Sequence, residues 1–316
     1  KFIVYLIYME KCLFAYNPLS GKGKIVKKEK EIVKMLEEKY QVEVCQSQYP
    51  GHIGDMILEK GEGIDLLVVS GGDGTLNEVV NSCMRLSRKP KIGYIPTGTV
   101  NDVAHSLGIP RDIKKAVKNI QNGQVFAHDV FKMNDRYGIY VCCSGLFTET
   151  SYATNQQQKK KMGKIAYALH GAKKIFTTQA VKLKLTYDSG TLEGKYAIML
   201  ILNSRSVAGF MINRRARLND GLVDVVLIKS KKDKVNFTSI CSVAMFFLRG
   251  LRYKDNRSMK VLELDKFHID TTDDTVINLD GEKIGAGSFD FEVIKQGIEI
   301  IVPSLKNLDK KIEKID

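Results

Sequence analysis

Residues 64–75 read IDLLVVSGGDGT, a run of aliphatic residues that ends in a glycine-rich turn. A short continuous aliphatic run of this kind is typical of a strand that helices bury on both faces. Glycine directly after the strand lets backbone N–H groups approach a ligand closely. The stretch therefore predicts a central parallel strand whose carboxyl end carries a binding loop.

Outward from this strand, the sequence alternates short apolar runs with amphipathic segments as far as Gly123. This alternation is the signature of βαβ units around a parallel sheet. Strands are predicted at 12–16, 42–46, 64–70 and 91–95, and surface helices at 24–39 and 112–121. We therefore expect an α/β domain over residues 10–126, with the C-terminal segment 297–316 as a candidate to return to it.

The texture changes after Gly123 to longer alternating strands joined by turns, which indicates an antiparallel β domain over residues 127–296. Its predicted strands are 180–187, 191–202 and 222–228, and its predicted helices are 162–176 and 235–249, the second ending at Gly250. The fold class is therefore α/β, with a mainly antiparallel β-sandwich as the second domain.

Composition limits the function classes. The chain has 316 residues with 49 Lys and Arg against 36 Asp and Glu, a formal net charge of +13. This charge predicts attraction to nucleic acid, an anionic membrane surface or phosphorylated small molecules. The six cysteines form no C-x-x-C pair, which favours reduced thiols and a cytoplasmic protein. No uninterrupted run of 18 apolar residues occurs, so we expect no membrane span.

Three loops follow predicted strands, at residues 17–23, 71–75 and 96–102. Because the carboxyl ends of parallel strands meet at one edge, where open α/β sheets bind ligands, we expect the loops to lie together. Thr75 to Glu78 and Thr99 to Asp102 fit the capping box, which predicts helices that start at these threonines. One such loop is more often an ordinary turn, but three at one edge favour a phosphate site.

No Walker A loop and no dinucleotide-binding fingerprint occurs in the sequence, so those two nucleotide-binding classes lose support. Asp73 lies among the glycines, where its carboxylate would repel a phosphate unless a cation or a positioned water separates the two. The second loop therefore predicts Mg²⁺.

Four segments together resemble the diacylglycerol kinase and sphingosine kinase-like lipid kinases, most closely the bacterial soluble diacylglycerol kinases. They are Asn17-Pro18-x-Ser20-Gly21-x-Gly23, Gly71-Gly72-Asp73-Gly74-Thr75-x-Asn77-Glu78-Val79, Pro96-x-Gly98-Thr99-x-Asn101-Asp102 and Leu279-Asp280-Gly281-Glu282. A G-G-D-G alone is shared with NAD kinases and phosphofructokinases, whereas the four segments are specific. The resemblance implies an NAD kinase/diacylglycerol kinase-like fold with a β-rich lipid-binding domain. It also implies transfer of the γ-phosphate of ATP to diacylglycerol, which gives phosphatidic acid.

The resemblance also implies residue roles. Glu282 would take the proton from the lipid hydroxyl with Asp280 as its partner, although from spacing alone Asp-Gly is a plain turn. Asp73 would join a Mg²⁺–water network, and Asp220 with the carbonyls of Arg217 and Leu222 would bind a structural Mg²⁺. The family's nucleotide-contacting threonine has Ser47 and Gln48 as its nearest positions here. The residues implied to contact ATP are Asn17, Ser20, Gly21, Gly71, Gly72, Gly74, Thr75, Asn77, Glu78, Thr99, Asn101 and Asp102.

The segment 150–187 contains eight lysines and no Asp or Glu. It predicts a basic amphipathic helix suited to an anionic membrane, although a solvated charged face would look the same. We expect a cytoplasmic enzyme, peripheral to the inner face of the membrane, that binds no nucleic acid; a homodimer is left open. The alternatives are a kinase of another lipid alcohol, such as a sphingoid base, isoprenoid alcohol or glycolipid, and a nonspecific polyanion or nucleic-acid binder.

Overall fold

The computed structural model describes residues 9–146, 178–252, 258–272, 275–306 and 308. The chain divides into two compact units. The α/β unit comprises residues 1–128 and 296–316, and the β-rich unit comprises residues 129–295. Strands β5 (Gln124–Met133) and β15 (Ser288–Val302) each begin in one unit and end in the other.

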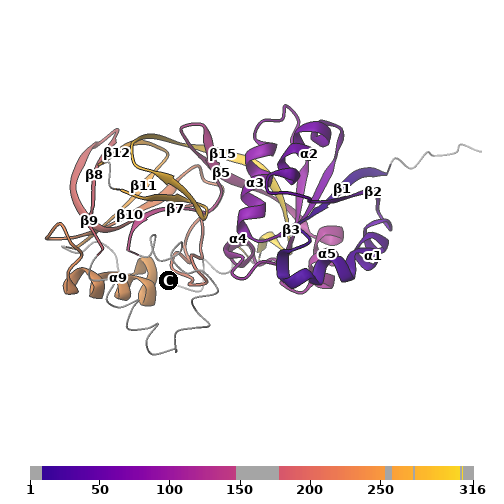
Figure 1. Cartoon of the computed structure of the whole chain (residues 1–316), viewed down its shortest axis with the longest axis horizontal. Coiled ribbons are helices and arrows are strands. Elements are labelled where there is room, and N and C mark those ends of the chain that lie inside the picture. The colour runs from indigo at the N-terminus through magenta and orange to yellow at the C-terminus, as the bar shows by residue number, and fades with distance from the viewer. Residues whose placement is uncertain (1–8, 147–177, 253–257, 273–274, 307, 309–316) are drawn as a thin grey trace, which may run out of the picture. The chain divides into compact units, whose positions relative to one another are not determined.

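The α/β unit is built on a parallel sheet with the strand order β4-β3-β1-β2, of which Figure 1 labels β1, β2 and β3. The strands are β1 (Glu10–Tyr16), β2 (Tyr40–Gln46), β3 (Leu66–Gly71) and β4 (Lys91–Pro96). All four lie within two residues of the predicted bounds. The end of β15 (Ser288–Val302) adds a further parallel neighbour, because Ile300 pairs with Ile92 of β4. Every residue of β3 is buried, so this strand is central, as its aliphatic sequence predicts.

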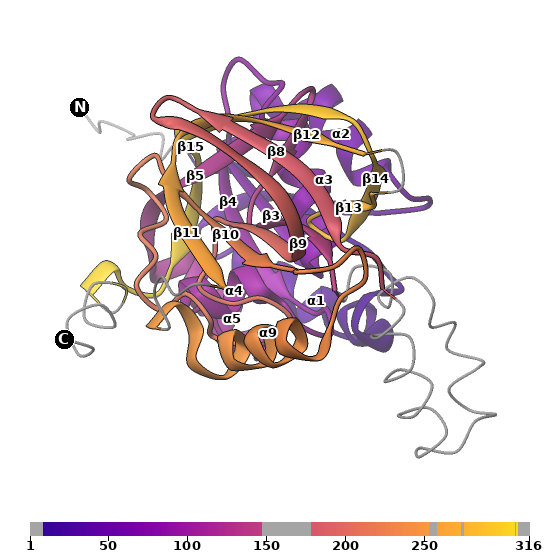
Figure 2. The same cartoon turned by 90° about the vertical axis from the view of Figure 1, so that its left-hand side faces the viewer.

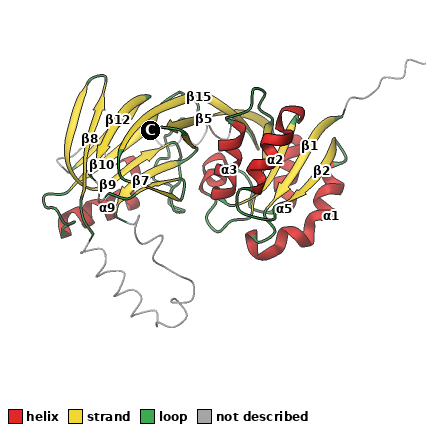
Figure 3. Ribbon diagram, turned by 45° about the horizontal axis from the view of Figure 1, so that its top comes forward, coloured by secondary structure: helices red, strands yellow, loops and turns green. Residues whose placement is uncertain are grey.

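Helices cover this sheet, as Figure 3 shows in red. They are α1 (Lys24–Leu36), α2 (His52–Lys60), α3 (Asp73–Cys83), α4 (Asp102–Leu107) and α5 (Ile113–Asn122), with short 3-10 turns at Ser20–Gly23 and Gly61–Gly63. Ile25, Ile32 and Leu36 of α1 are buried in one cluster with Phe14 and Val68 of the sheet. Their spacing puts them on one face of α1, and most of the charged residues between them lie on the opposite face. Glu29 is an exception, because its carboxylate accepts the Tyr16 hydroxyl of the sheet.

The two predicted capping boxes are wrong. Helix α3 starts at Asp73 after an N-cap at Gly72, so Thr75 is its third residue and not its cap. Helix α4 has Asn101 as its N-cap, two residues after Thr99. The [ST]-x-x-[DE] pattern marks Thr75 and Thr99 as the caps. Instead, α3 begins after Gly72, whose backbone is extended, and α4 begins after Asn101, whose backbone is left-handed.

The β-rich unit is a set of antiparallel strands, and those from β8 onward are seen in red to yellow in Figure 2. The path β14-β13-β7-β9-β8-β12-β15 forms most of it, and β10 joins β9 to β11. The strands are β5 (Gln124–Met133), β6 (Arg136–Gly138), β7 (Val141–Gly145), β8 (Val181–Tyr187), β9 (Gly190–Leu202), β10 (Val223–Lys229), β11 (Met259–Leu264), β12 (Lys266–Thr271), β13 (Ile277–Leu279) and β14 (Glu282–Gly285). The antiparallel prediction for this half is therefore confirmed.

Helix α9 (Phe237–Arg249) packs on strands β9 and β10 of this unit. The Asn236 side chain caps it by accepting the Ser239 N–H at 2.9 Å, and Gly250 ends it with φ 64°, as the sequence predicts. The other predicted helix, 162–176, lies outside the described residues. None of the described helices combines the length and the apolar character needed to cross a membrane.

Candidate active site

The three predicted loops lie together at the carboxyl edge of β1, β3 and β4. The Ser20 hydroxyl is 2.9 Å from the Thr97 hydroxyl, which is 3.3 Å from that of Ser70. The backbone N–H of Asn17 donates to the Ser70 carbonyl at 3.3 Å. The loops after β1 and β4 therefore contact each other and the end of β3, as the sequence predicts.

Glycine is required where the second and third loops meet. A Cβ on Gly98 would lie 2.5 Å from the Gly72 Cα and 2.6 Å from the Asn101 Oδ1. A Cβ on Gly71 would lie 2.4 Å from the Thr75 hydroxyl. Gly98 permits the close approach of its backbone to that of Gly72, and Gly71 leaves room for the Thr75 side chain. Both are structural tasks that are independent of any ligand. Gly74 differs, because a Cβ there would meet nothing within 4 Å.

The amino end of α3 offers backbone donors to a ligand. Its N-cap is Gly72, which has no side chain and makes no capping hydrogen bond, and Gly74 in the first turn is exposed. The first N–H groups of a helix have no partner within the helix and carry the positive end of its dipole. An anion such as a phosphate is therefore well accommodated at Gly72 to Thr75.

The Asp73 carboxylate turns to a different helix. It accepts the backbone N–H of Val103, in the first turn of α4, at 3.2 Å. Burial raises the pKa of Asp73, and the N–H groups of Val103, Asp102 and Asn101 act in the opposite direction. These N–H donors compensate the negative charge of the Asp73 carboxylate, for which the sequence predicts a cation. Asp73 by itself therefore does not require Mg²⁺.

Asn101 links the third loop to the sheet through Tyr94, a residue that was not predicted from the sequence. Its backbone has φ 58°, and its side-chain amide donates to the Gly98 carbonyl at 2.8 Å. The buried Tyr94 hydroxyl lies 3.4 Å from the Asn101 Oδ1 and donates to the Gly71 carbonyl at 3.2 Å. Tyr94 therefore contacts both the second and the third loop through its hydroxyl. The signal in the sequence is a single polar side-chain atom within the apolar run of β4.

Several predicted nucleotide contacts already have protein partners. The Asn81 amide donates to the carbonyl and to the Oδ1 of Asn77, and Glu78 accepts the Gly54 N–H at 2.8 Å. The Thr99 carbonyl accepts from Arg111 at 2.8 Å. These side chains and loops are held in place by the protein, which preorganises the edge. Ser47 and Gln48 lie at the end of β2, and Gln48 N–H donates to the His52 ring.

The Asp-Gly-Glu segment lies in the β-rich unit as the predicted hairpin. Leu279 pairs with Glu282 across the turn, and both central residues have positive φ, 50° at Asp280 and 99° at Gly281. This is the requirement of the tight hairpin turn that Asp-Gly favours. The Glu282 side chain is exposed and lies 3.5 Å from Arg136, which is also exposed. Glu282 thus presents a carboxylate to solvent at a rigid turn.

Asp280 is buried, and its carboxylate holds a distant stretch of backbone. It accepts the N–H groups of Ile139, Tyr140 and Val141 at 2.6, 3.1 and 2.8 Å. In return, the Asp280 N–H donates to the Val141 carbonyl at 2.9 Å. The residue predicted to assist Glu282 chemically is thus placed to fix the position of the hairpin.

We predict that Asp280→Ala destabilises the β-rich unit by about 3 kcal/mol or more, because three N–H groups, two of them buried, lose a charged acceptor. Alanine also tolerates the positive φ less well than Asp or Asn. Asp280→Asn should cost clearly less, since it keeps one acceptor oxygen and tolerates the turn. Thermal unfolding of the two variants beside the native protein measures this; equal melting temperatures for all three would contradict it.

The loop predicted to bind a structural Mg²⁺ contains a tight turn with Gly221 at φ 88°. Asp220 Oδ1 accepts the Leu222 N–H at 3.1 Å, which places the carboxylate beside that backbone. The carbonyls of Ala216 and Leu218 accept from Arg205 and from the Asp129 N–H, and the predicted ligand Arg217 lies between them. One carboxylate with main-chain carbonyls is an all-oxygen donor set, which fits Mg²⁺. The described residues contain no cluster of three or more His, Cys, Asp or Glu side chains that could hold a metal.

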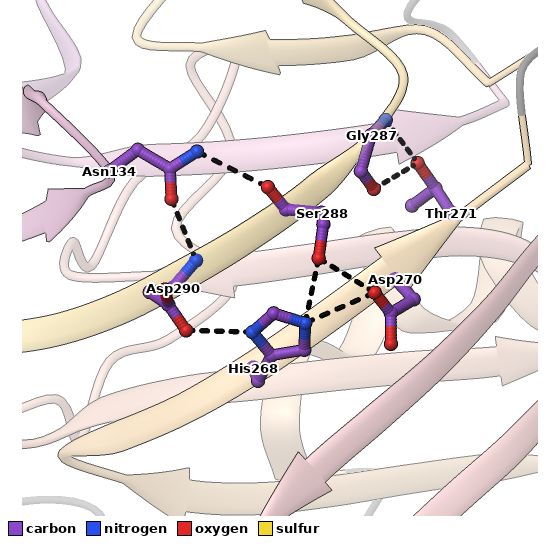
Figure 4. Close-up of polar contacts among 7 residues, drawn as sticks. All are labelled: Asn134, His268, Asp270, Thr271, Gly287, Ser288 and Asp290. Atoms are coloured by element: carbon purple, nitrogen blue, oxygen red, sulfur yellow. Dashed lines mark hydrogen bonds and ion pairs between the residues drawn. The ribbon is translucent and has the colours of Figure 1, made fainter.

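A second polar cluster, on β12 and β15, has the appearance of a catalytic triad (Figure 4). His268 Nδ1 lies 2.7 Å from Asp290, and its Nε2 lies 2.9 Å from the Ser288 hydroxyl. However, Ser288 also donates to Asp270 at 2.7 Å, and Asp270 shares the same His268 nitrogen. Since β12 and β15 pair directly at these residues, the cluster is explained as a cross-strand ladder.

This ladder predicts a pH dependence of stability. The neighbouring carboxylates of Asp290 and Asp270 raise the pKa of His268 above its ordinary value of 6.5. The protonated ring is the stabilising form, so its contribution is full below pH 6.5 and is lost as the pH rises through the folded-state pKa. His268→Gln should therefore lower the melting temperature more at pH 6 than at pH 9. A difference that is the same at both pH values would contradict this.

Two predictions concern residues outside the described part of the chain. Six of the eight lysines of the segment 150–187, including Lys159 to Lys161 and Lys164, lie in residues 147–177, whereas Lys182 and Lys184 lie on β8. The sequence also points to two segments of the second half, 145–149 and 203–210, as candidates for choosing the lipid acceptor, and residues 147–149 of the first lie outside the described part. The second acceptor-choosing segment, 203–210, is described, and its Asn203 is buried and donates to the Asp129 and Ile139 carbonyls at 2.8 and 3.2 Å.

Comparison with known proteins agrees with this architecture. The diacylglycerol kinase catalytic domain model matches residues 11–133, and the YegS C-terminal NAD kinase beta sandwich-like domain model matches residues 141–302. The diacylglycerol kinase of Bacillus subtilis (strain 168) is 30% identical over 302 residues, 94% of this chain and 98% of that protein. The diacylglycerol kinase of Staphylococcus carnosus (strain TM300) is 33% identical over 301 residues, 93% of this chain and 96% of that one. A crystal structure of a proposed diacylglycerol kinase from Bacillus anthracis is 26% identical with a TM-score of 0.79, covering 93% of this chain and 95% of that chain.

The two folded units and these matches define the class of protein: a two-domain lipid kinase with an NAD kinase/diacylglycerol kinase-like fold. Within this class, the chain belongs to the diacylglycerol kinase family. The resemblance inferred from the four sequence segments is therefore confirmed.

Proposed function

We propose that the protein transfers the γ-phosphate of ATP to the hydroxyl of diacylglycerol and so forms phosphatidic acid. The observation that carries the proposal is the glycine-lined edge of the α/β unit, where three preorganised loops meet beside the uncapped amino end of α3. Phosphoryl transfer asks the protein mainly for positioning and charge neutralisation, which such an edge supplies to a triphosphate.

In this proposal the α/β unit is the ATP-binding domain. The backbone N–H groups of Gly72, Gly74 and Thr75 would hold phosphate oxygens, with Ser20 and Asn17 closing the site from the first loop. Asn77, Glu78, Asn101 and Asp102 would act by fixing the loops, because their partners are within the protein. Mg²⁺ bound with ATP would neutralise the charge of the phosphates, and Asp73 would join the water network around the ion.

The β-rich unit would be the lipid-binding domain, with Glu282 as the general base. An exposed carboxylate on a rigid hairpin can accept the proton of an attacking hydroxyl. Asp280 would be a positioning residue, which holds the hairpin through residues 139–141. Asp220 and the carbonyls of Arg217 and Leu222 would bind a structural Mg²⁺ that fixes their loop.

The lipid acceptor places the enzyme at a membrane surface, and we propose a cytoplasmic protein that binds the inner face peripherally. The net charge of +13 supports this location, since the leaflet it would meet is anionic. Family members named for diacylglycerol support that acceptor over a sphingoid base, isoprenoid alcohol or glycolipid.

An acceptor panel tests the proposal. Dioleoylglycerol, sphinganine, farnesol and a glycolipid are offered separately in mixed micelles with Mg-ATP, and phosphorylated products are identified by mass spectrometry. We expect phosphatidic acid at a rate at least tenfold above every other product. A faster product from another alcohol would reassign the substrate, and no product with any alcohol would overturn the proposal.

A further inference from the structure

Helix α9 has one buried face and one exposed face. Its sequence, FTSICSVAMFFLR, contains no charged residue before Arg249. Val243 and Phe246 are buried in a cluster with Val226 and Ile228 of β10. Figure 2 shows α9 lying lengthwise on the outside of the β-rich unit, with the strands on one side of it. The helix therefore has an inner face that the core explains.

The outer face of α9 is also apolar, which the core does not explain. Phe237 is 68% exposed and Leu248 is 79% exposed, with the exposed Cys241 and Ala244 between them. Their spacing of four, three and four residues puts them in one stripe along the helix. Phe210, 54% exposed, extends the stripe, because its ring packs on Phe247 with centroids 5.8 Å apart.

Cations lie at both ends of this apolar face. The exposed residues Lys231, Lys232 and Lys234 lie just before the helix, and Arg249 lies at its end. The exposed Arg214 and Arg215 follow Ile212, whose carbonyl accepts the Leu251 N–H at 2.8 Å just beyond α9. Asp233 lies among these lysines in the sequence, but its carboxylate forms ion pairs with Lys182 and Lys195 instead. An apolar stripe edged by positive charge is the pattern of a helix that lies in a membrane interface.

We propose that the outer face of α9 docks the enzyme on an anionic lipid bilayer; the inference rests on the proposed function, which needs a lipid acceptor. Phe210, Phe237 and Leu248 would insert among the acyl chains, and the lysines and arginines at its ends would contact acidic head groups. Charge favours a lipid bilayer over a second copy of the chain at this face, because two copies would bring the lysines and arginines of one copy close to those of the other.

Cys241 provides a probe at the centre of the stripe. It is the exposed cysteine of the six, all of which are described, so a thiol-reactive NBD dye will label it preferentially. With phosphatidylglycerol vesicles we expect a blue shift and a several-fold rise in NBD emission; phosphatidylcholine vesicles should give neither. If the thiol reacts only after unfolding, another part of the chain covers the face, and the proposal fails.

Paired variants make the test independent of the probe. Phe237→Glu with Leu248→Glu should weaken partitioning onto phosphatidylglycerol vesicles at least tenfold, whereas Leu58→Glu, a matched exposed leucine on α2, should leave it unchanged. Unchanged partitioning of the double variant, or light scattering that shows a native dimer dissociated by it, would overturn the bilayer assignment. Phosphorylation of dispersed dihexanoylglycerol separates the two claims: the double variant should retain it, and its absence in the native enzyme would instead overturn the proposed function.

Discussion

Glu282→Gln is expected to lower the rate of lipid phosphorylation by about 100- to 10,000-fold, the range that a general base contributes. The glutamine keeps the size of the side chain but cannot accept the proton of the attacking hydroxyl. Because Glu282 is exposed and its contact with Arg136 is a surface pair, the change should not affect folding. The measurement is kcat with dioleoylglycerol, beside ATP affinity, which should stay the same.

Two controls bracket this result. Glu292→Gln replaces another exposed glutamate, on β15, and should leave kcat within a factor of two of the native value. Arg136→Ala removes the cation beside Glu282 without removing the base, so its loss of rate should be far smaller. A Glu282→Gln enzyme with nearly native kcat would exclude this residue as the base.

Asp73→Asn is expected to separate stability from activity. Burial raises the pKa of Asp73 above 3.8, so folding disfavours its charged form, and this cost is fully present at pH values above the folded-state pKa. At neutral pH the asparagine removes the cost and keeps an oxygen for the α4 N–H groups, so the melting temperature should stay the same or rise. If Asp73 also orients the Mg²⁺–water network, kcat/KM should fall about 10- to 100-fold.

The matched control is Asp112→Asn. Asp112 caps α5 by accepting the Lys115 N–H at 3.0 Å, and asparagine is an equally good cap. We expect this variant to match the native protein in stability and in activity. Native activity in Asp73→Asn would show that Asp73 serves only as an acceptor for α4, and a large loss of stability would show that burial of its charge is not the dominant cost.

The parallel strands and the meeting of three loops could be predicted because both follow from local patterns. A buried aliphatic run specifies a central strand, and strands that run parallel bring their carboxyl ends to one edge whatever the details of packing. The Asp280-Gly281 turn was predictable for the same reason, since positive φ at two consecutive residues selects this pair.

Helix starts and the roles of buried polar groups could not be predicted, because distant residues decide them. Asp280 bonds to backbone about 140 residues away, and Asp73 accepts from the next helix rather than its own. Tyr94 reads as one more residue of an apolar strand until the loops that its hydroxyl supports are in place. The outer face of α9 reads as core in the sequence, because only the fold shows which apolar residues remain outside.

The most direct test of the central claim is transfer of label from [γ-³²P]ATP to dioleoylglycerol in mixed micelles with Mg²⁺, comparing the native protein with Glu282→Gln and Asp73→Asn. We expect labelled phosphatidic acid from the native protein, almost none from Glu282→Gln, and about 10- to 100-fold less than native from Asp73→Asn. Labelled lipid formed equally by all three would contradict the assigned roles, and none from the native protein, with ATP still bound, would contradict diacylglycerol as the acceptor.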